Sequence, residues 1–264
     1  MRKKRKVVNI KIKTNERIAD MNEIMAIAEG TWRRILRMRV VYFLILCVLI
    51  LIASAYNYDV LSMQEHKPLM IDVSLVLNTI AVILVVISMT FEIPKELREG
   101  VASTLLTKPL GRTQYLIGKV VGTIITGLII SAMIAVGFFV IFKFAFNEQI
   151  ALAMLQSHIL VMASIIPMSA IAVFFSVFMP EMITPIITAI AIWFSYSTEK
   201  LIGVKFLYGG ILPDLGLYNF KAFAVYGGEQ MSWSYIGLAI LWGIIFSIFL
   251  VTVSSLIFRF RDIK

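Results

Sequence analysis

Cysteine and histidine are almost absent from the sequence. The chain of 264 residues has one cysteine, Cys47, and two histidines, His66 and His158. A single cysteine cannot form an intrachain disulfide, and Cys47 lies in an apolar run where a small buried side chain needs no further role. Neither histidine has a second type of metal ligand at a suitable spacing, so we expect neither to be catalytic.

Nucleotide-binding and hydrolase motifs are missing as well. The sequence contains no G-x-x-x-x-G-K-[ST] phosphate loop, no H-E-x-x-H and no G-x-S-x-G. We therefore do not expect ATP to bind this chain by a phosphate loop. We predict no catalytic residue, metal site or cofactor of its own.

Charged residues are scarce. They make up 16% of the chain, hydrophobic residues make up 59%, and the mean hydropathy is +0.89. Soluble domains average roughly 25% charged and about 45–50% apolar residues. This composition predicts an integral membrane protein, and one built from α-helices, because a helix satisfies its backbone polar groups internally in the hydrocarbon core.

Six apolar stretches are close to the 17–25 residues that a spanning helix needs. They cover residues 40–57, 71–92, 116–142, 151–178, 182–199 and 235–258. Ionisable groups are nearly absent from their interiors, and we expect Asp72, Glu92 and Glu181 at span ends, where water solvates them. This pattern is unlike that of an ion-coupled carrier, which places such groups near the midplane of the bilayer.

The basic residues are distributed unevenly along the chain. Of the 25 Lys and Arg residues, 12 lie before Val40, five lie between Lys95 and Lys119, and three follow Phe258. The bias places these regions on the cytoplasmic side and predicts that both termini are cytoplasmic. The net charge of +9 therefore reports topology and lipid contact rather than nucleic-acid binding.

The domain organisation predicted from these patterns has two parts. Residues 1–39 form a basic cytoplasmic N-terminus that ends in an amphipathic interfacial elbow helix over residues 21–39, with a simple extension of the first span as the alternative. Residues 40–264 form the six-helix transmembrane domain. The external loop 200–234 is too apolar for a free loop and too interrupted by Gly and Pro for a span. It is either a lid over a substrate exit or interfacial packing, and belt aromatics favour packing.

The stretch Phe91–Lys119 is the only substantial charged run between two apolar segments. Pro94 suits the first turn of a helix. Leu97, Val101 and Leu105 recur every four residues and form one apolar stripe on that helix. A stripe of this kind is typical of a helix that docks in a groove on a partner.

The same stretch also carries signals for a helix end and a helix start. Pro109 and Gly111 end the docking helix, and we expect Thr113 to cap the helix that returns to the membrane. Gly118 and Gly122 lie at a spacing that allows another helix to approach the third span closely.

At these residues the sequence resembles the membrane subunits of type-2 ABC transporters, the export-type permeases. The segment between the second and third spans of that family typically reads E-x-G-T/V, then a leucine pair, a small residue, proline, a basic residue and Gly-Lys. The matching residues here are Glu99-Gly100-Val101, Leu105-Leu106, Pro109, Arg112 and Gly118-Lys119. Val101 stands where threonine is common. The six-span layout, the elbow helix and the long last external loop extend the resemblance over nearly the whole chain.

The resemblance implies a permease subunit in the cytoplasmic (inner) membrane. It would pair with a second copy or a related permease, and a separate ATPase dimer would dock beneath the pair and bind the ATP. The segment around Glu96–Lys108 would be the coupling helix through which the ATPase moves the spans. The implied ATPase-docking residues are Glu96, Leu97, Glu99, Gly100, Val101, Leu105, Leu106, Pro109 and Arg112. The substrate, and the presence of a periplasmic accessory protein, are left open.

Two other classes of function stay open on the sequence. The chain could be a membrane anchor or sensor subunit whose cytoplasmic segment docks a partner that is not an ATPase. It could also be an intramembrane enzyme acting on lipid, although no clustered His, Asp or Ser residues favour that reading.

Overall fold

Helices form every regular element of the chain that the computed structural model describes, namely residues 21–57, 66–100, 111–197, 213–226 and 230–260. The elements in chain order are the elbow helix Met21–Leu36, α2 (Arg39–Ser54), η1 (Ala55–Asn57), α4 (His66–Arg98), α6 (Arg112–Phe146), α7 (Leu152–Phe178), α8 (Thr184–Tyr196), η4 (Leu215–Tyr218), α10 (Lys221–Val225) and α11 (Trp233–Arg259).

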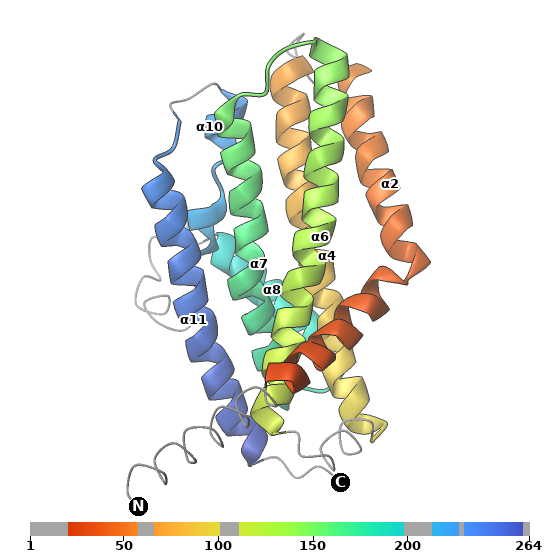
Figure 1. Cartoon of the computed structure of the whole chain (residues 1–264), viewed down its shortest axis with the longest axis vertical. Helices are drawn as coiled ribbons and strands as arrows, with labels where there is room; N and C mark the ends of the chain where they lie inside the picture. The colour runs from red at the N-terminus through yellow and green to blue at the C-terminus, as the bar shows by residue number, and fades with distance from the viewer. Residues whose placement is uncertain (1–20, 58–65, 101–110, 198–212, 227–229, 261–264) are drawn as a thin grey trace, which may run out of the picture.

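Four of the described helices, α4, α6, α7 and α11, are long and apolar enough to cross a membrane. They run roughly alongside one another (Figure 1), and α7 contacts α4, α6, α8 and α11. Most of the apolar part of α7 is buried, whereas the other three also present large apolar side chains outward. By helix length and hydropathy the chain is a multi-pass membrane protein.

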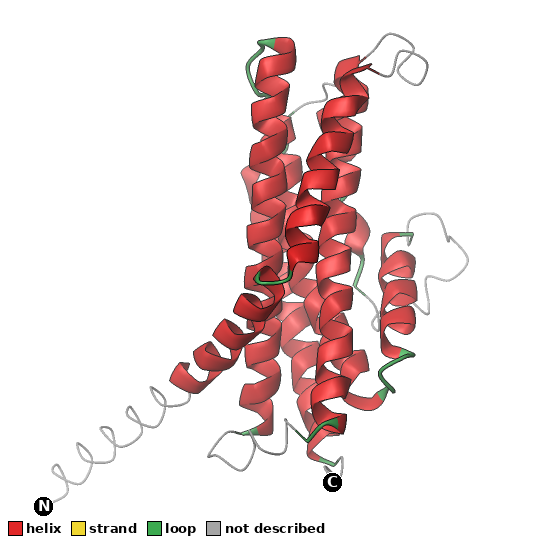
Figure 2. Cartoon of the chain, turned by 90° about the vertical axis from the view of Figure 1, so that its right-hand side faces the viewer, coloured by secondary structure: helices red, strands yellow, loops and turns green. Residues whose placement is uncertain are grey.

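The first predicted span has a different form. The elbow helix and α2 meet at a bend of 61° at Arg37 and Met38, and only together do they reach the length and hydropathy of a span. Figure 2 shows the elbow helix slanting away from the long axis of the bundle. Arg37 and Arg39 lie at the bend and are exposed. At this position their guanidinium groups can stay in the polar interface of the membrane.

The prediction of six spans is therefore only partly supported. The helix α8, in the fifth predicted span, has 13 residues, which is about 20 Å of helix and shorter than the roughly 30 Å hydrocarbon core. Counting the bent pair as one span, the described residues provide up to five candidate spans.

The second and third predicted spans are longer than expected. The helices α4 and α6 have 33 and 35 residues, or about 50 Å each at 1.5 Å per residue. Both therefore extend beyond a hydrocarbon core of about 30 Å.

Pro94 does not begin a new helix, so that prediction was wrong. It lies inside α4, which continues to Arg98, and its side chain is buried. Proline is tolerated inside spanning helices because neighbouring helices satisfy the freed backbone groups. Glu92 and Glu96, on either side of it, both accept hydrogen bonds from Lys119 of α6.

We use the term basal end for the end of the molecule that holds the last turn of α4, the first turn of α6 and the last turn of α11 (Figure 1). An ion pair between Arg98 and Glu181, at 2.6 Å, joins α4 to the turn between α7 and α8. Arg112 at the start of α6 donates to the carbonyl oxygens of Phe258 and Arg259 at 2.8 and 3.1 Å. A basic side chain on the last carbonyls stabilises a helix C-terminus.

The elbow helix packs against two glycines of α6. A methyl group at Gly118 would lie 2.7 Å from Cβ of Ile27, and one at Gly122 would lie 2.7 Å from Cβ of Thr31 and 2.9 Å from the carbonyl oxygen of Ala28. No side chain larger than hydrogen fits between these helices without a shift. The prediction that Thr113 caps α6 was wrong, because the cap position is Gly111 and the Thr113 hydroxyl bonds that of Ser255 at 2.5 Å.

The Gly122→Ala variant is expected to lower the melting temperature of the purified protein in detergent. The added methyl group meets backbone and a branched side chain, and overpacking of this kind costs about 1–3 kcal/mol. Gly237→Ala is the matched control, because no heavy atom lies within 4 Å of a Cβ at that position of α11. The control should keep or raise the melting temperature, since alanine favours a helix over glycine. Equal melting temperatures for the two variants would contradict the close packing.

Candidate functional site

Five polar side chains from three helices meet inside the basal end and form what we call the ion cluster. Glu92 and Glu96 lie one turn apart on one face of α4, and Tyr115 and Lys119 lie one turn apart on the facing side of α6. Arg34 reaches them from the elbow helix. The cluster therefore joins the elbow helix to both helices that flank residues 101–110.

Each cation in the ion cluster contacts both carboxylates. Arg34 lies 2.7 Å from Glu92 and 2.7 Å from Glu96. Lys119 lies 3.3 Å from Glu92 and 2.7 Å from Glu96. The Tyr115 hydroxyl donates to the second oxygen of Glu96 at 2.5 Å. Two negative and two positive charges give no net charge.

The ion cluster is largely buried, so its charges must balance for the fold to be stable. Glu92, Glu96, Tyr115 and Lys119 are each less than a tenth exposed, whereas the side chain of Arg34 is about half exposed at 47% and closes the outer edge. Removing charges from water costs several kcal/mol per ion unless partners and hydrogen bonds compensate. Because the carboxylates are occupied by fixed cations, the cluster is suited to holding three helices together rather than to acid–base chemistry. Among the described residues no group of three or more metal-binding side chains occurs.

The structure places the predicted docking residues in different environments. Glu96 is buried in the ion cluster, and Leu97 packs partly buried beside the basal apolar core. Glu99 is exposed and lies 3.9 Å from Lys95. Gly100 ends α4 with φ = 71°, a left-handed conformation that favours glycine.

The remaining predicted docking residues divide into two groups. Arg112 contacts the last carbonyls of α11, as described above. Val101, Leu105, Leu106 and Pro109 lie outside the residues that the structure describes.

Three members of the ion cluster were missed by the sequence reasoning. Glu92 was expected at a solvated span end, which was wrong because only 9% of it is exposed. Arg34 lies in the predicted elbow helix, for which the sequence indicated only a basic interfacial face, and no role was predicted for Tyr115. The available signal was the pairing of Glu92 with Glu96 and of Tyr115 with Lys119, each at i and i+4 next to a long apolar stretch.

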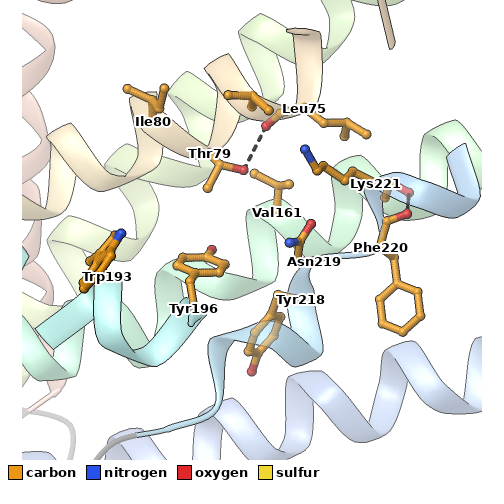
Figure 3. Close-up of a pocket in the computed structure, with 12 residues that line it drawn as sticks. Leu75, Thr79, Ile80, Val161, Trp193, Tyr196, Tyr218, Asn219, Phe220 and Lys221 are labelled. Carbon is orange, nitrogen blue, oxygen red and sulfur yellow. Dashed lines mark hydrogen bonds between the residues drawn. The ribbon is translucent and has the colours of Figure 1, made fainter. Parts of the chain in front are cut away.

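Apart from the ion cluster, the molecule has a pocket toward the end opposite the basal end. It lies between α4, α7, α8 and the segment of η4 and α10. It has a volume of about 480 Å³. Figure 3 shows Trp193 and Tyr196 on one side of it and Asn219 and Lys221 on the other. Lys221 pairs with Asp72 of α4 at 3.1 Å, so its charge is balanced locally.

Residues 213–226, in the loop that the sequence predicts to be external, pack onto the bundle. Leu215 and Tyr218 are buried, and the Tyr218 hydroxyl donates to the carbonyl oxygen of Ala239 at 2.8 Å. Burial raises the pKa of Tyr218 to about 12, so the hydroxyl keeps the proton that it donates. These contacts agree with the packing alternative for the loop. Of the aromatic residues expected in an interfacial belt, Tyr226 and Trp233 are exposed, but Tyr218 is buried, so that expectation was wrong for Tyr218.

Comparison with known proteins identifies no family. No protein-family model matches the chain, and no curated protein sequence matches it.

Removing a matched pair of charges from the ion cluster should cost less than the sum of the costs of removing each charge alone. Lys119→Gln leaves a net charge of −1 and Glu92→Gln leaves +1, and breaking a buried pair on one side costs about 3–5 kcal/mol. The double variant restores neutrality, because Arg34 and Glu96 remain 2.7 Å apart. Its loss in melting temperature should be clearly smaller than the sum of the two single losses.

The control for this cycle is the exposed ion pair of Lys67 and Glu148 at the other end of the molecule. Exposed pairs contribute roughly 0–1 kcal/mol. Lys67→Gln, Glu148→Gln and their double variant should therefore change the melting temperature little. Additive losses at Lys119 and Glu92 would show that the cluster charges do not act together.

Proposed function

We propose that this chain is the membrane-spanning permease subunit of an ATP-binding-cassette transporter. It would move an unidentified substrate across the cytoplasmic membrane, using ATP hydrolysis by a separate nucleotide-binding subunit. A second copy of the chain or a related permease would complete the transport unit. The proposal combines the sequence resemblance around Glu99–Lys119 with the arrangement of the basal end.

The ion cluster is the observation that carries this proposal. The two helices that flank residues 101–110 are bonded to each other and to the elbow helix by charges that are costly to separate. A force applied to the segment between them would therefore move α4 and α6 together, because the ion cluster holds the ends of the two helices in place. That is the mechanical property that a coupling segment needs.

The lengths of α4 and α6 agree with this role. Both exceed the hydrocarbon core by roughly 20 Å. The segment between them therefore starts and ends on helices that can project beyond the bilayer. If the basal end faces the cytoplasm, as the distribution of Lys and Arg predicts, a soluble ATPase can reach the segment.

The alternative function is that of a membrane anchor or sensor subunit that docks a cytoplasmic partner without transport. The exposed carboxylate of Glu99 and the predicted Leu97, Val101 and Leu105 stripe would serve either kind of partner. The identity of the partner separates the two functions. An ATPase with a phosphate loop supports the permease, and a partner without one supports the anchor.

Replacement of the predicted leucine pair is expected to abolish ATPase association. In mild detergent the wild-type chain should co-purify with an ATPase that carries a phosphate loop. Leu105→Asp plus Leu106→Asp places two charges in the predicted apolar contact with the ATPase. The double variant should lose the ATPase while the chain stays in the membrane fraction. The control is Ile150→Asp, an exposed position at the opposite end. An ATPase retained by the leucine variant would move the docking site elsewhere, and its absence from the wild type would refute the permease function.

The orientation of the chain can be tested by cysteine labelling in intact cells. Cys47→Ser removes the single native thiol. On that background, Gln149→Cys should react with a membrane-impermeant maleimide in intact cells, because its exposed side chain follows α6 at the predicted external end. Lys95→Cys, exposed at the basal end, should react only after permeabilisation. The reverse pattern would place the basal end outside the cell and exclude a cytoplasmic ATPase.

A further inference from the structure

A groove lies between α6 and α11 on the outer surface of the basal half of the bundle. It has a volume of about 380 Å³. It opens there because α11 packs mainly along α7 and contacts α6 much less extensively. Figure 1 shows the first turns of α6 and the last turns of α11 converging at the basal end. The groove does not include any residue of the ion cluster.

The lining of the groove changes from apolar to polar along its length. Val120 and Val251 form a buried floor, and Ile248 and Leu256 form exposed apolar rims. At the basal limit the lining contains the hydroxyl pair of Thr113 and Ser255 and then the side chain of Arg259. The groove is therefore amphipathic, with its cation at one end.

The length of the groove matches one leaflet of a bilayer. Along α11 it extends from Ser247 to Arg259, which is about 18 Å of helix. Half of a hydrocarbon core of roughly 30 Å is about 15 Å. An acyl chain in the groove would thus place its headgroup at the level of Arg259, where a long basic side chain reaches the polar interface.

Among the described residues that line the groove, Arg259 is a cation without an ion-pair partner. It is exposed in the last turn of α11, and none of the ion pairs found between described residues involves it. Its neighbour Arg112 is already bonded to the carbonyl oxygens that end α11. Basic side chains between spanning helices are a recurrent site for anionic lipid headgroups.

We propose that this groove binds one anionic phospholipid. An acyl chain lies along Val120, Val251 and the rims, and the phosphate group lies at Arg259 with the hydroxyls of Thr113 and Ser255 beside it. The groove contains none of the residues implied in ATPase docking, although one of them, Arg112, adjoins it, and the lipid proposal does not depend on an ATPase partner. Its occupant would join α6 to α11 where direct contact between the two helices is limited.

The test is native mass spectrometry of the full chain, purified in detergent and equilibrated with equal amounts of phosphatidylglycerol and phosphatidylcholine of identical acyl chains. Wild-type protein should retain phosphatidylglycerol about fivefold more than phosphatidylcholine, as one basic group near the headgroup provides. Arg259→Gln should bring the ratio close to one, and Arg259→Lys should keep most of the preference. Lys95→Gln removes an exposed basal cation outside the groove and should leave the ratio unchanged.

The acyl-chain part of the site is tested by filling the groove. Thr252 is an exposed lining residue, so Thr252→Trp should lower retention of both lipids without disturbing the core. Leu241→Trp, at an exposed position on the same helix outside the groove, should retain lipid like the wild type. A wild-type ratio near one, or a ratio unchanged by Arg259→Gln, would overturn the headgroup assignment. Full lipid retention by Thr252→Trp would overturn the assignment of the acyl chain to the groove.

Discussion

Charge buried in a low-dielectric interior is stable only when every ion has a partner, and this constraint governs the basal end of the molecule. Glu92 and Glu96 are nearly inaccessible to water and lie at the end of the long apolar stretch of α4. Neither Lys119 nor Arg34 alone could neutralise both carboxylates. The cluster is complete only when α4, α6 and the elbow helix are all in place, so the three helices depend on one another for their position.

Several other features follow from that arrangement. The elbow helix must approach α6 closely enough for Arg34 to reach the carboxylates, and Gly118 and Gly122 remove the side chains that would prevent the approach. The bend of 61° lets the elbow helix cross α6 at the basal end while α2 turns along the bundle. The glycines, the bend and the charges thus form one structural unit built around a single close crossing.

The sequence predicted the elements that depend on local composition and failed where tertiary contacts decide. Hydropathy placed α4, α6, α7 and α11 correctly, because about twenty apolar residues can only be a spanning helix in a bilayer. Pro94 was read as a helix start, yet it lies inside α4, where the carboxylates on either side of it accept hydrogen bonds from α6. Glu92 near a span end was read as solvated because nothing in its own helix shows that Lys119 and Arg34 face it.

The shared contacts within the ion cluster bear on how such a joint could move. Both cations bond both carboxylates, so a small sliding of α4 along α6 lengthens one contact of a cation while the other remains. A full separation of the two helices would instead leave buried ions without partners and would cost several kcal/mol for each ion. Cations that bridge two carboxylates therefore permit a small sliding of α4 along α6 and oppose the separation of the two helices. A connection with this property transmits a push along the helix axes while keeping the flanks of residues 101–110 together, and this is the behaviour that the proposed coupling function requires.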